Sequence, residues 1–540
     1  MTKRTQEELN QGKQVDVSPQ WQQCFKLPNK PLEGWFSKVR AGSNEEVRGT
    51  LFSERSVGSV LQAWNSHLKK VADKWPTLYE FECDLRKKVG PMSIQKPLSE
   101  RLDDIDHYYS DVSDPGEPID AKAIDAALEE WDCSSPPNIW KPLDTIRAMK
   151  LSTNSGAPYF GRRRAVLNKT YPSSVWVDTK GIVRQDLKYT SWEACAILGW
   201  RGQEGGPEPD DVKQRVIWMM PFAVNIAELQ VYKPLIEYAQ HNNLVPAWVS
   251  EDAVDAEITK LFDTKEEDDL VVCTDFSRFD QHFNENLAAA SKRLLSQLFV
   301  ASGDMDDWLN EVFPIKYCIP LAYDWDTIRT GKHGMASGSG GTNADETLAH
   351  RCLQYEAAQS AGSELNRHSM CLGDDGVLTY PGISVESVVD TYTKHGLEMN
   401  VDKQYASTED CVYLRRWHHK DYRINDVCVG VYSTMRALGR LMEQERYYPN
   451  WSEKMVALRQ LSILENVKYH PLNEEFVRFC MKGDKYRLGL DIPGFLSKID
   501  SIAEQAKEDI PGFGDWRKDV QSKTTPMSES WIVNYLKSLK

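Results

Sequence analysis

Two adjacent aspartates between two apolar segments constrain this chain more than any other feature of its sequence. Asp374 and Asp375 lie in Gly-Asp-Asp-Gly at residues 373–376, with Cys-Leu before them and Val-Leu after them. An Asp-Gly pair between strand-like segments predicts a tight β-hairpin. Because neighbouring carboxylates repel each other, the turn is either an ordinary solvent-facing one or a site where a divalent cation neutralises the charge. These residues alone leave both interpretations open.

A second pair of acids follows another predicted strand. Residues 269–276, Asp-Leu-Val-Val-Cys-Thr-Asp-Phe, indicate a short buried strand ending at Asp275, and Asp280 follows five residues later. A strand-end carboxylate beside a hairpin carboxylate can share two Mg²⁺ ions about 3.5–4 Å apart, the arrangement used in phosphoryl and nucleotidyl transfer. The alternative for Asp275 is a helix cap, because a helical stretch follows it.

The third segment of interest is the glycine-rich run at 334–343, Gly-Met-Ala-Ser-Gly-Ser-Gly-Gly-Thr-Asn, which leads into a helix. Its flexible backbone can approach a sugar or phosphate closely, and the N–H groups of a helix start favour negative charge. It is not a P-loop, because no Gly-Lys-Ser/Thr follows. A plain linker is the alternative.

Charge and cysteine content exclude several classes of protein. The net charge of -15 argues against a surface that is basic throughout, although clusters at 86–88, 161–164 and 415–416 leave room for a basic channel. Eleven dispersed cysteines without CxxC spacing indicate reduced thiols and no zinc site. The polar N-terminus and the absence of a long apolar run predict a chain that is neither secreted nor membrane-spanning.

The order of predicted elements indicates the fold class. A strand at 269–276, a helix at 284–301, a helix after 343, the hairpin at 371–380 and a helix at 385–397 are followed by mostly helical sequence from about 430. This order predicts an α+β fold with an antiparallel sheet backed by helices.

Taken in chain order, these segments resemble the motifs of viral RNA-dependent RNA polymerases, and are most similar to the picobirnavirus polymerases. The matching residues are Asp275 and Asp280 for motif A, Ser337, Gly338, Gly341 and Thr342 for motif B, and Gly373, Asp374 and Asp375 for motif C. Further matches are 153–159 for motif G, 213–215 for motif F, 396–403 for motif D and 413–417 for motif E.

The resemblance implies a role for each of these residues. Asp275, Asp374 and Asp375 are the expected ligands of two Mg²⁺ or Mn²⁺ ions and, with Lys403 as general acid, the expected catalytic residues. The residues expected to bind the ribonucleoside triphosphate are Asp280, Ser337, Gly338, Thr342, Asn343, Lys213 and Arg215. Those expected to bind RNA are Thr153, Gly156, Pro158, Arg415 and Arg416.

The resemblance also implies a right hand of fingers, palm and thumb. We expect an N-terminal extension with fingertips at 1–60, fingers at 61–265, a palm with an inserted fingers segment at 266–430, and a thumb with the C-terminal segment at 431–540. Its implied partners are an RNA template and product, nucleotides and a viral capsid protein, in a virion interior or host cytoplasm. The implied function is transcription and replication of a viral genome, expected to be double-stranded RNA.

Two features remain open in the sequence. In many relatives an Asn that reads the ribose lies about one helical turn after the motif B Thr, whereas here Asn343 follows Thr342 directly and Glu346 occupies the later place. The second is the loop at 509–519, where Phe513 and Trp516 are candidates for an aromatic initiation platform, with an ordinary thumb loop as the alternative.

Three other functions fit parts of the pattern. A reverse transcriptase or DNA polymerase typically has an aromatic gate where this chain has Asp280. An inactive RNA-binding homologue would be expected to lack one of the three metal-binding acids. A metal-dependent phosphohydrolase needs the acids but not motifs F and G. The sequence therefore favours an RNA-directed RNA polymerase.

Overall fold

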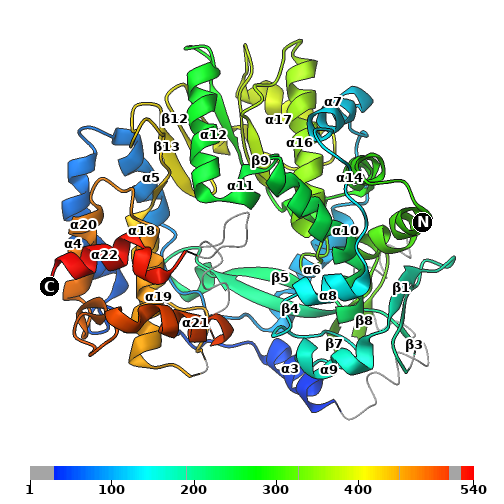
Figure 1. Ribbon diagram of the computed structural model, residues 1–540, viewed down its shortest axis with the longest axis horizontal. Coiled ribbons are helices and arrows are strands. Elements are labelled where there is room, and N and C mark those ends of the chain that lie inside the picture. Colours follow the sequence, from blue (N-terminus) through cyan, green and yellow to red (C-terminus); the bar gives the residue numbers. More distant parts are fainter. Residues whose placement is uncertain (1–28, 190, 326, 449, 510–524) are drawn as a thin grey trace.

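The computed structural model describes residues 29–509 and 525–540 of the 540-residue chain, apart from 190, 326 and 449. Three groups of elements surround the middle of the molecule in Figure 1. A sheet with its helices lies at the top, a second sheet lies at the lower right, and a group of helices lies at the left.

The upper sheet carries the predicted strand and hairpin. Its four strands are antiparallel in the order β11, β6, β10, β9. Their bounds are Tyr405–Ser407 (β11), Val271–Thr274 (β6), Asp375–Leu378 (β10) and Met370–Leu372 (β9). The pairing of Asp375 with Leu372 leaves Gly373 and Asp374 as a two-residue turn. Gly373 has φ +57, which a glycine at the first turn position adopts without strain.

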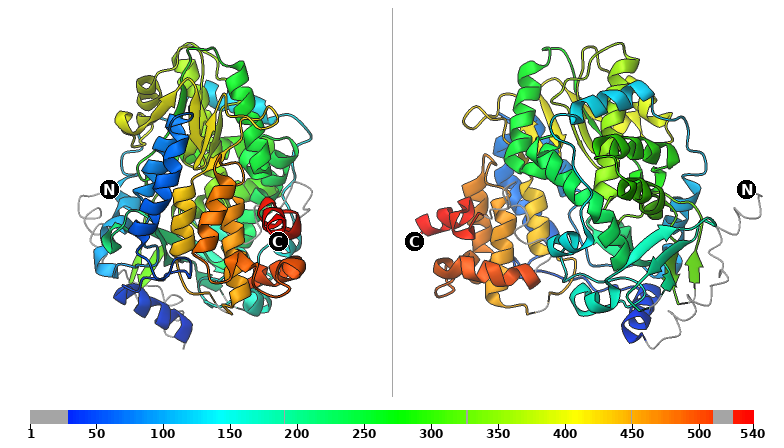
Figure 2. Two further views of the ribbon diagram at one scale, coloured as in Figure 1. Left: turned by 90° about the vertical axis from the view of Figure 1, so that its left-hand side faces the viewer. Right: turned by 45° about the vertical axis from the view of Figure 1, so that its right-hand side comes forward.

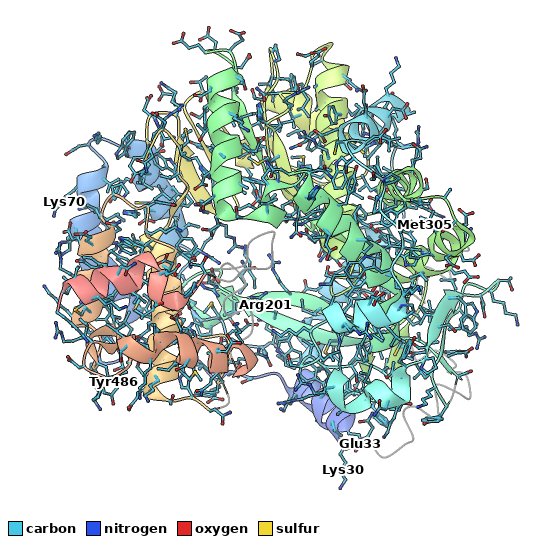
Figure 3. All side chains as sticks on the ribbon, in the orientation of Figure 1. Lys30, Glu33, Lys70, Arg201, Met305 and Tyr486 are labelled. Atoms are coloured by element: carbon cyan, nitrogen blue, oxygen red, sulfur yellow. The ribbon has the colours of Figure 1, made fainter. Side chains whose placement is uncertain are left out.

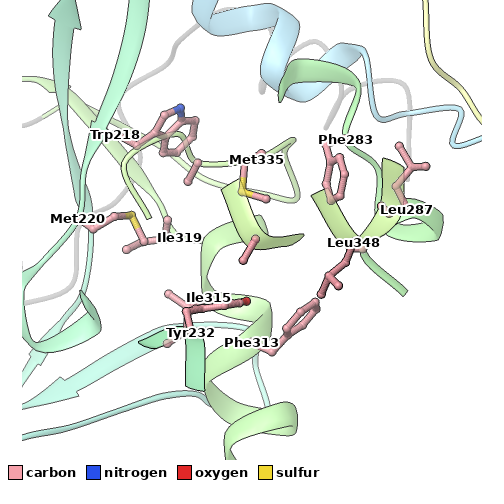
Figure 4. Packing of buried hydrophobic residues seen from close by; sticks show 14 of the residues in the cluster. Trp218, Met220, Tyr232, Phe283, Leu287, Phe313, Ile315, Ile319, Met335 and Leu348 are labelled. Carbon is pink, nitrogen blue, oxygen red and sulfur yellow. The ribbon is translucent and has the colours of Figure 1, made fainter. Parts of the chain in front are cut away.

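The strand side chains alternate between two cores. Val271 and Cys273 pack into a cluster with α12 (Glu251–Thr264), whereas Val272 joins the main core. That core includes α14 (Glu285–Leu298), α16 (Thr342–Ser360) and α17 (Val385–Thr393). Because the sheet is covered on both faces, the central strand β6 is buried along its whole length, as its apolar sequence suggested. Figure 4 shows this main core at close range.

The lower sheet has the order β5, β4, β7, β8. Its strands are β5 (Lys213–Met219), β4 (Ala196–Gln203), β7 (Leu321–Asp324) and β8 (Thr327–Arg329). A separate small sheet contains β1 (Ser174–Val177), β2 (Val183–Asp186) and β3 (Ser191–Glu193). The helices in these parts of the chain are α3 (Lys30–Ala41), α6 (Leu102–Ser110), α7 (Ala121–Trp131), α8 (Pro142–Ala148), α9 (Arg163–Thr170), α10 (Phe222–His241), α11 (Pro246–Val249), α13 (Phe279–His282) and α15 (Gly303–Asp307).

The helices at the left combine distant parts of the chain. They are α4 (Val57–Leu68), α5 (Pro76–Arg86), α18 (Thr434–Met442), α19 (Glu453–Glu465), α20 (Asn473–Lys482), α21 (Ile499–Asp509) and α22 (Trp531–Ser538). One hydrophobic core joins Trp64 and Leu78 to Leu438, Leu458 and Phe476. Figure 2 shows α4 and α5, in blue, beside the orange C-terminal helices. Residues 57–86, which fall mostly within the segment we assigned to the fingers, therefore share their core with the predicted thumb.

A three-stranded sheet links the upper sheet to these helices. It contains β12 (Asp410–Tyr413), β13 (Arg416–His419) and β14 (Val431–Tyr432). Leu414 and Arg415 form the β12–β13 turn, and both have positive φ, +53 and +60. Non-glycine residues adopt this conformation at a cost, so the turn needs support from its surroundings.

The predicted elements around the motifs are present, and the α+β class is confirmed. The loop at 510–519, with Phe513 and Trp516, lies outside the described residues. No helix in the described part of the chain is both long and apolar enough to cross a membrane.

Candidate active site

The register of the upper sheet brings the predicted acids together. Gly376 of β10 pairs with Thr274 of β6, so Asp375 and Asp275 are the next residues toward the same end of the sheet. Asp374 lies in the adjoining turn, and both Asp275 and Asp374 are exposed. A Cβ at Gly376 would overlap His350 and the Thr274 hydroxyl, so only glycine lets these strands pack so closely here.

Gln404 fixes the backbone at Asp275. The Asp275 N–H donates to Gln404 Oε1 at 2.7 Å, and Gln404 Nε2 donates back to the Asp275 carbonyl at 2.9 Å. Both bonds leave the Asp275 carboxylate available. The sequence alone did not identify Gln404 as a site residue. Its one sequence signal is that it directly follows Lys403 of motif D.

The Asp374 carboxyl is repelled by the other acids of the cluster. Its pKa is raised by desolvation and by the negative charges of Asp280 and Asp275, while Arg215 opposes the shift. A bound cation would relieve this repulsion, because an opposite charge nearby favours the ionised form.

Asp375 has a structural partner of its own. Its Oδ2 accepts a hydrogen bond from the Leu414 N–H at 3.0 Å and so supports the strained β12–β13 turn. Burial and, after it, the negative charge of Asp374 raise the pKa of Asp375 to about 7, although the Leu414 bond and Arg415 oppose the rise. One of its oxygens is thus committed to the turn, which fits a secondary role at the metals.

Asp280 connects motif A to motif B. Its Oδ2 accepts a hydrogen bond from the Ser337 hydroxyl, and its carbonyl accepts one from the Met335 N–H at 2.8 Å. Glu346 is 4% exposed, and burial, the charge of Asp280 and a hydrogen bond with Asp280 raise its pKa well above the usual range. A protonated Glu346 is the form that can donate to the Asp280 carboxylate.

The motif B loop is pressed against β5. Gly338 has φ +133, and a Cβ there would overlap the Trp218 carbonyl. The Trp218 N–H donates to the Ser337 carbonyl at 2.8 Å. Figure 4 shows Trp218 beside Met335, at the start of this loop. The glycine that the sequence marked as flexible is therefore needed for this close approach.

Thr342 and Asn343 begin α16 next to the hairpin turn. The Thr342 hydroxyl donates to the Ala336 carbonyl at 3.4 Å, which closes the loop on itself. Asn343 is exposed, and its Oδ1 accepts a hydrogen bond from Trp248 Nε1 at 2.8 Å. A Cβ at Gly373 would lie 3.5 Å from both Asn343 Nδ2 and Glu346 Oε2, so both candidate sugar-reading residues lie beside motif C.

Basic residues of β5 face these acids. Lys213 and Arg215 lie two residues apart on the strand, and both are exposed. The pKa of Lys213 is lowered by partial burial and by Lys88, Arg215 and Arg415, while Asp275 acts in the opposite direction. The negative charge of a bound triphosphate would offset the repulsion among these basic side chains. Lys403 ends a 3₁₀ turn, Val401–Lys403, and is exposed.

The two arginines of motif E differ in their exposure and in their partners. The Arg415 guanidinium is 43% exposed and lies 3.8 Å from Glu204. Arg416 is 6% exposed, and its Nη1 and Nη2 donate to the two carboxylate oxygens of buried Asp255 at 2.8 and 3.1 Å. We therefore correct the expectation that Arg416 touches RNA, because its charge and donors are used inside the protein.

The motif G segment lies at the start of α9. Thr153 is exposed, Gly156 has φ +62 and packs against the Met220 carbonyl, and the Pro158 carbonyl accepts a hydrogen bond from Asn29 Nδ2 at 3.1 Å. In the cluster at 161–164, Arg162 and Arg164 are exposed, whereas Arg163 stacks over the Phe222 ring at 5.3 Å. Only part of the cluster can therefore face RNA.

The residues present fit a divalent cation by chemistry. Hard carboxylate oxygens are what Mg²⁺ prefers. No hydrogen bond to the Asp275 side chain is found within the described part of the chain, so that carboxylate is free to ligate. In the same residues no group of three or more His, Cys, Asp and Glu side chains is already drawn together as a cage.

Comparison with known proteins agrees with this geometry. The family model described as "Viral RNA-dependent RNA polymerase" matches residues 132–428. A "Potential RNA-dependent RNA polymerase" of a human picobirnavirus (strain Human/Thailand/Hy005102/-) is 55% identical over 535 residues, covering 97% of this chain and all of the relative.

Solved structures give the same result. The crystal structure of the RNA-dependent RNA polymerase of a human picobirnavirus has a TM-score of 0.92 at 54% identity, covering 97% of this chain and all of the other. Its insertion loop deletion mutant has a TM-score of 0.91 at 54% identity over the same shares. The Sicinivirus 3Dpol polymerase, with 14% identity and a TM-score of 0.51 over 73% of this chain and 88% of its own, shares the fold.

Proposed function

The chain belongs to the viral RNA-dependent RNA polymerases, and on that premise we propose that it extends RNA by two-metal nucleotidyl transfer at Asp275 and Asp374. The observation that carries this mechanism is the β6–β10 register. It brings the open carboxylate of Asp275 to the end of the sheet where the adjoining turn carries the open carboxylate of Asp374, opposite the basic residues of β5. The overall activity, RNA-directed RNA synthesis, follows from the family itself.

Members of this family typically use divalent metal ions. When bound, two Mg²⁺ or Mn²⁺ ions would make the attacking 3′-hydroxyl more acidic and neutralise the leaving pyrophosphate. Asp275 and Asp374 would be their main ligands, and Asp375 a secondary one that also keeps the motif E turn in place. Lys213 and Arg215 would grip the triphosphate, with Arg215 suited to bidentate phosphate contacts. Lys403 would protonate the pyrophosphate as a general acid.

Sugar selection falls to the motif A and motif B contacts. Asp280, held by Ser337 and hydrogen-bonded to Glu346, provides the acceptor for a ribose hydroxyl. Gly338 allows the close approach of the loop, and Thr342 and Asn343 complete the wall beside the hairpin turn. A site whose polar groups are matched to a hydroxyl rejects a deoxyribose, because those groups are then left unpaired.

The RNA strands would be bound along the basic surfaces. Thr153, Gly156 and Pro158 would guide the template, and Arg415 would hold the product strand. Transcription and replication of a double-stranded RNA genome, with a viral capsid protein as a further partner and a site of action in the virion interior or host cytoplasm, complete the proposal. We also propose fingers, palm and thumb near the expected boundaries, with α4 and α5 moved to the thumb because they share its core.

The test is template-dependent incorporation of one labelled ribonucleotide in the presence of Mg²⁺. Wild-type protein should extend the RNA, and Asp374→Asn should lower the incorporation rate by at least about a thousandfold, because metal stabilisation supplies several kcal/mol of the barrier. Asp306→Asn on the exposed helix α15 is the matched control and should behave as wild type. Incorporation by Asp374→Asn at the wild-type rate would contradict the mechanism.

A further inference from the structure

Glu228, in the middle of α10, is a buried acid that none of the polymerase motifs includes. It is 0% exposed, yet its carboxylate reaches the motif B loop. Oε2 accepts a hydrogen bond from the Ser339 hydroxyl, and Oε1 accepts one from the Gly340 N–H at 3.2 Å. Ser339 Oγ in turn accepts the Gly341 N–H at 3.1 Å. Through these bonds Glu228 controls three consecutive residues immediately before Thr342.

A second set of contacts fixes Glu228 itself. Asn225 Nδ2 donates to Glu228 Oε1 at 3.1 Å, and Asn225 Oδ1 accepts a hydrogen bond from Arg163 Nη2 at 2.8 Å. Arg163 also donates to the Lys150 carbonyl at 3.2 Å, and its own N–H donates to the Thr153 carbonyl at 2.9 Å. A chain of three side chains therefore runs from the motif G segment to the motif B loop.

A buried ion pair fixes the first turn of α16, which directly follows the loop. Lys316 Nζ lies 3.0 Å from Asp345 Oδ2, and both side chains are 0% exposed. Tyr232 of α10 and Tyr317 donate to the two Asp345 oxygens at 2.7 and 2.6 Å. Burial raises the pKa of Glu228, whereas Lys316 and the Ser339, Gly340 and Asn225 bonds oppose the rise.

Small residues make the loop dependent on these bonds. A Cβ at Gly340 would meet Leu229, and one at Gly341 would overlap Tyr232, so α10 presses directly on the loop backbone. Figure 4 shows Tyr232 close to Ile315, below the segment that carries Met335. Glycines supply no side chains of their own to fix a conformation. The hydrogen bonds that Ser339 and Gly340 donate to Glu228 therefore act together with this packing to select one conformation of residues 339–341.

We propose that Glu228 is a positioning residue for nucleotide selection. From α10, it holds the motif B loop in the conformation that accepts the incoming nucleotide. The chain from Arg163 through Asn225 sets the carboxylate, so that the loop beside the nucleotide is tied to the segment that guides the template. This inference rests on the proposed function, because it assumes that residues 337–343 contact the incoming nucleotide.

The experiment measures single-nucleotide incorporation kinetics for Glu228→Gln, Ser339→Ala and the double variant. Hydrogen bonds to a charged acceptor are the strong ones, so each single variant should raise the KM for ribonucleotides about tenfold and narrow the preference for ribose over deoxyribose. The kcat at saturating nucleotide should change much less than KM. Because Ser339→Ala removes one of the contacts that Glu228→Gln already weakens, the double variant should be no worse than Glu228→Gln alone. Glu237→Gln, an exposed acid on the same helix, is the matched control.

The outcomes separate this inference from the proposed function. KM and sugar preference equal to those of the Glu237→Gln control in both single variants would overturn the inference while incorporation itself stands. Independent, multiplying effects in the double variant would overturn it as well. If Glu228→Gln does not fold, Ser339→Ala decides alone, because that change removes only a hydroxyl. Wild-type protein that incorporates no ribonucleotide would overturn the proposed function, and the inference with it.

Discussion

The acids at the open end of the upper sheet and the buried acids of the molecule differ in their hydrogen-bond partners. Asp275 and Asp374 are exposed, and no other side chain is found bonded to either carboxylate in the described residues. By contrast, the buried acid Asp345 has Lys316 and two tyrosine hydroxyls as partners, and Glu228 has three donors. The open acids keep their lone pairs for a ligand, whereas the buried acids use theirs to fix the loop.

The left-hand helices add a third kind of acid. Glu82 of α5 is 0% exposed and accepts hydrogen bonds from the hydroxyl and N–H of Thr434, at the start of α18. Its nearest basic group is His470, at 3.8 Å, and burial lowers the pKa of that imidazole to about 3. Without a cation, burial raises the pKa of Glu82 itself to about 7. The partner, and not burial alone, therefore decides what a buried acid contributes.

The largest effect on stability should come from removing the buried cation. Lys316→Met leaves Asp345 buried without its charge partner and should lower the free energy of unfolding by about 3–5 kcal/mol. Lys332→Met is the matched control, since Lys332 also pairs with an acid, Glu285, at 3.2 Å, but both are exposed. That change should stay within about 0.5 kcal/mol. Denaturant titration measures both losses of unfolding free energy, and equal losses would contradict the difference between the buried and the exposed ion pair.

A smaller effect should appear in the pH dependence of Glu82→Gln. An acid whose pKa rises from 4.5 to about 7 on folding holds an extra proton in the native state, so wild-type stability is lost as pH rises through this window. His470, with its lowered pKa, acts in the opposite sense below pH 6.5, so the difference between variant and wild type is the quantity to follow.

Between pH 5 and pH 8 we expect the free energy of unfolding of Glu82→Gln to rise relative to that of wild type by up to about 3 kcal/mol. Unfolding of both proteins at each pH measures this difference. Glu80→Gln, an exposed acid on the same helix, should show no such gain. A pH-independent difference for Glu82→Gln would mean that this acid does not carry an extra proton in the folded protein.

Local signals explain what the sequence could predict. The Gly-Asp-Asp-Gly turn, the apolar strand before Asp275 and the glycine-rich loop each determine a structure within a few residues, and the family and the α+β class are both confirmed. The alternation along β5 also placed Lys213 and Arg215 on one side of the strand.

Long-range packing explains what the sequence could not predict. Arg416 reads as a surface arginine until Asp255, 161 residues earlier, is seen beside it. The packing of α4 and α5 against the C-terminal helices depends on a core shared with residues more than 300 positions away. Glu228 carries no motif signal, because its partners Asn225 and Ser339 meet it only through the packing of α10 on the loop.

Arg201 shows the same limit at a surface contact. This β4 residue, labelled between the lower sheet and the left-hand helices in Figure 3, lies 3.4 Å from Glu445, just after α18. An ion pair at the surface, here between exposed Arg201 and half-buried Glu445, contributes little to stability, typically less than about 1 kcal/mol. It nevertheless marks where the lower sheet meets the predicted thumb, and no local sequence pattern predicts such a pairing.

Direct measurement of Mn²⁺ binding tests the central claim, that the open carboxylates are kept free for metal. Electron paramagnetic resonance can count free Mn²⁺ while wild type, Asp275→Asn and Asp374→Asn are titrated in the presence of nucleotide and template. We predict that each variant weakens Mn²⁺ binding at least about tenfold, whereas Asp306→Asn binds Mn²⁺ as wild type does. Unchanged Mn²⁺ affinity in both Asp275→Asn and Asp374→Asn would contradict the account.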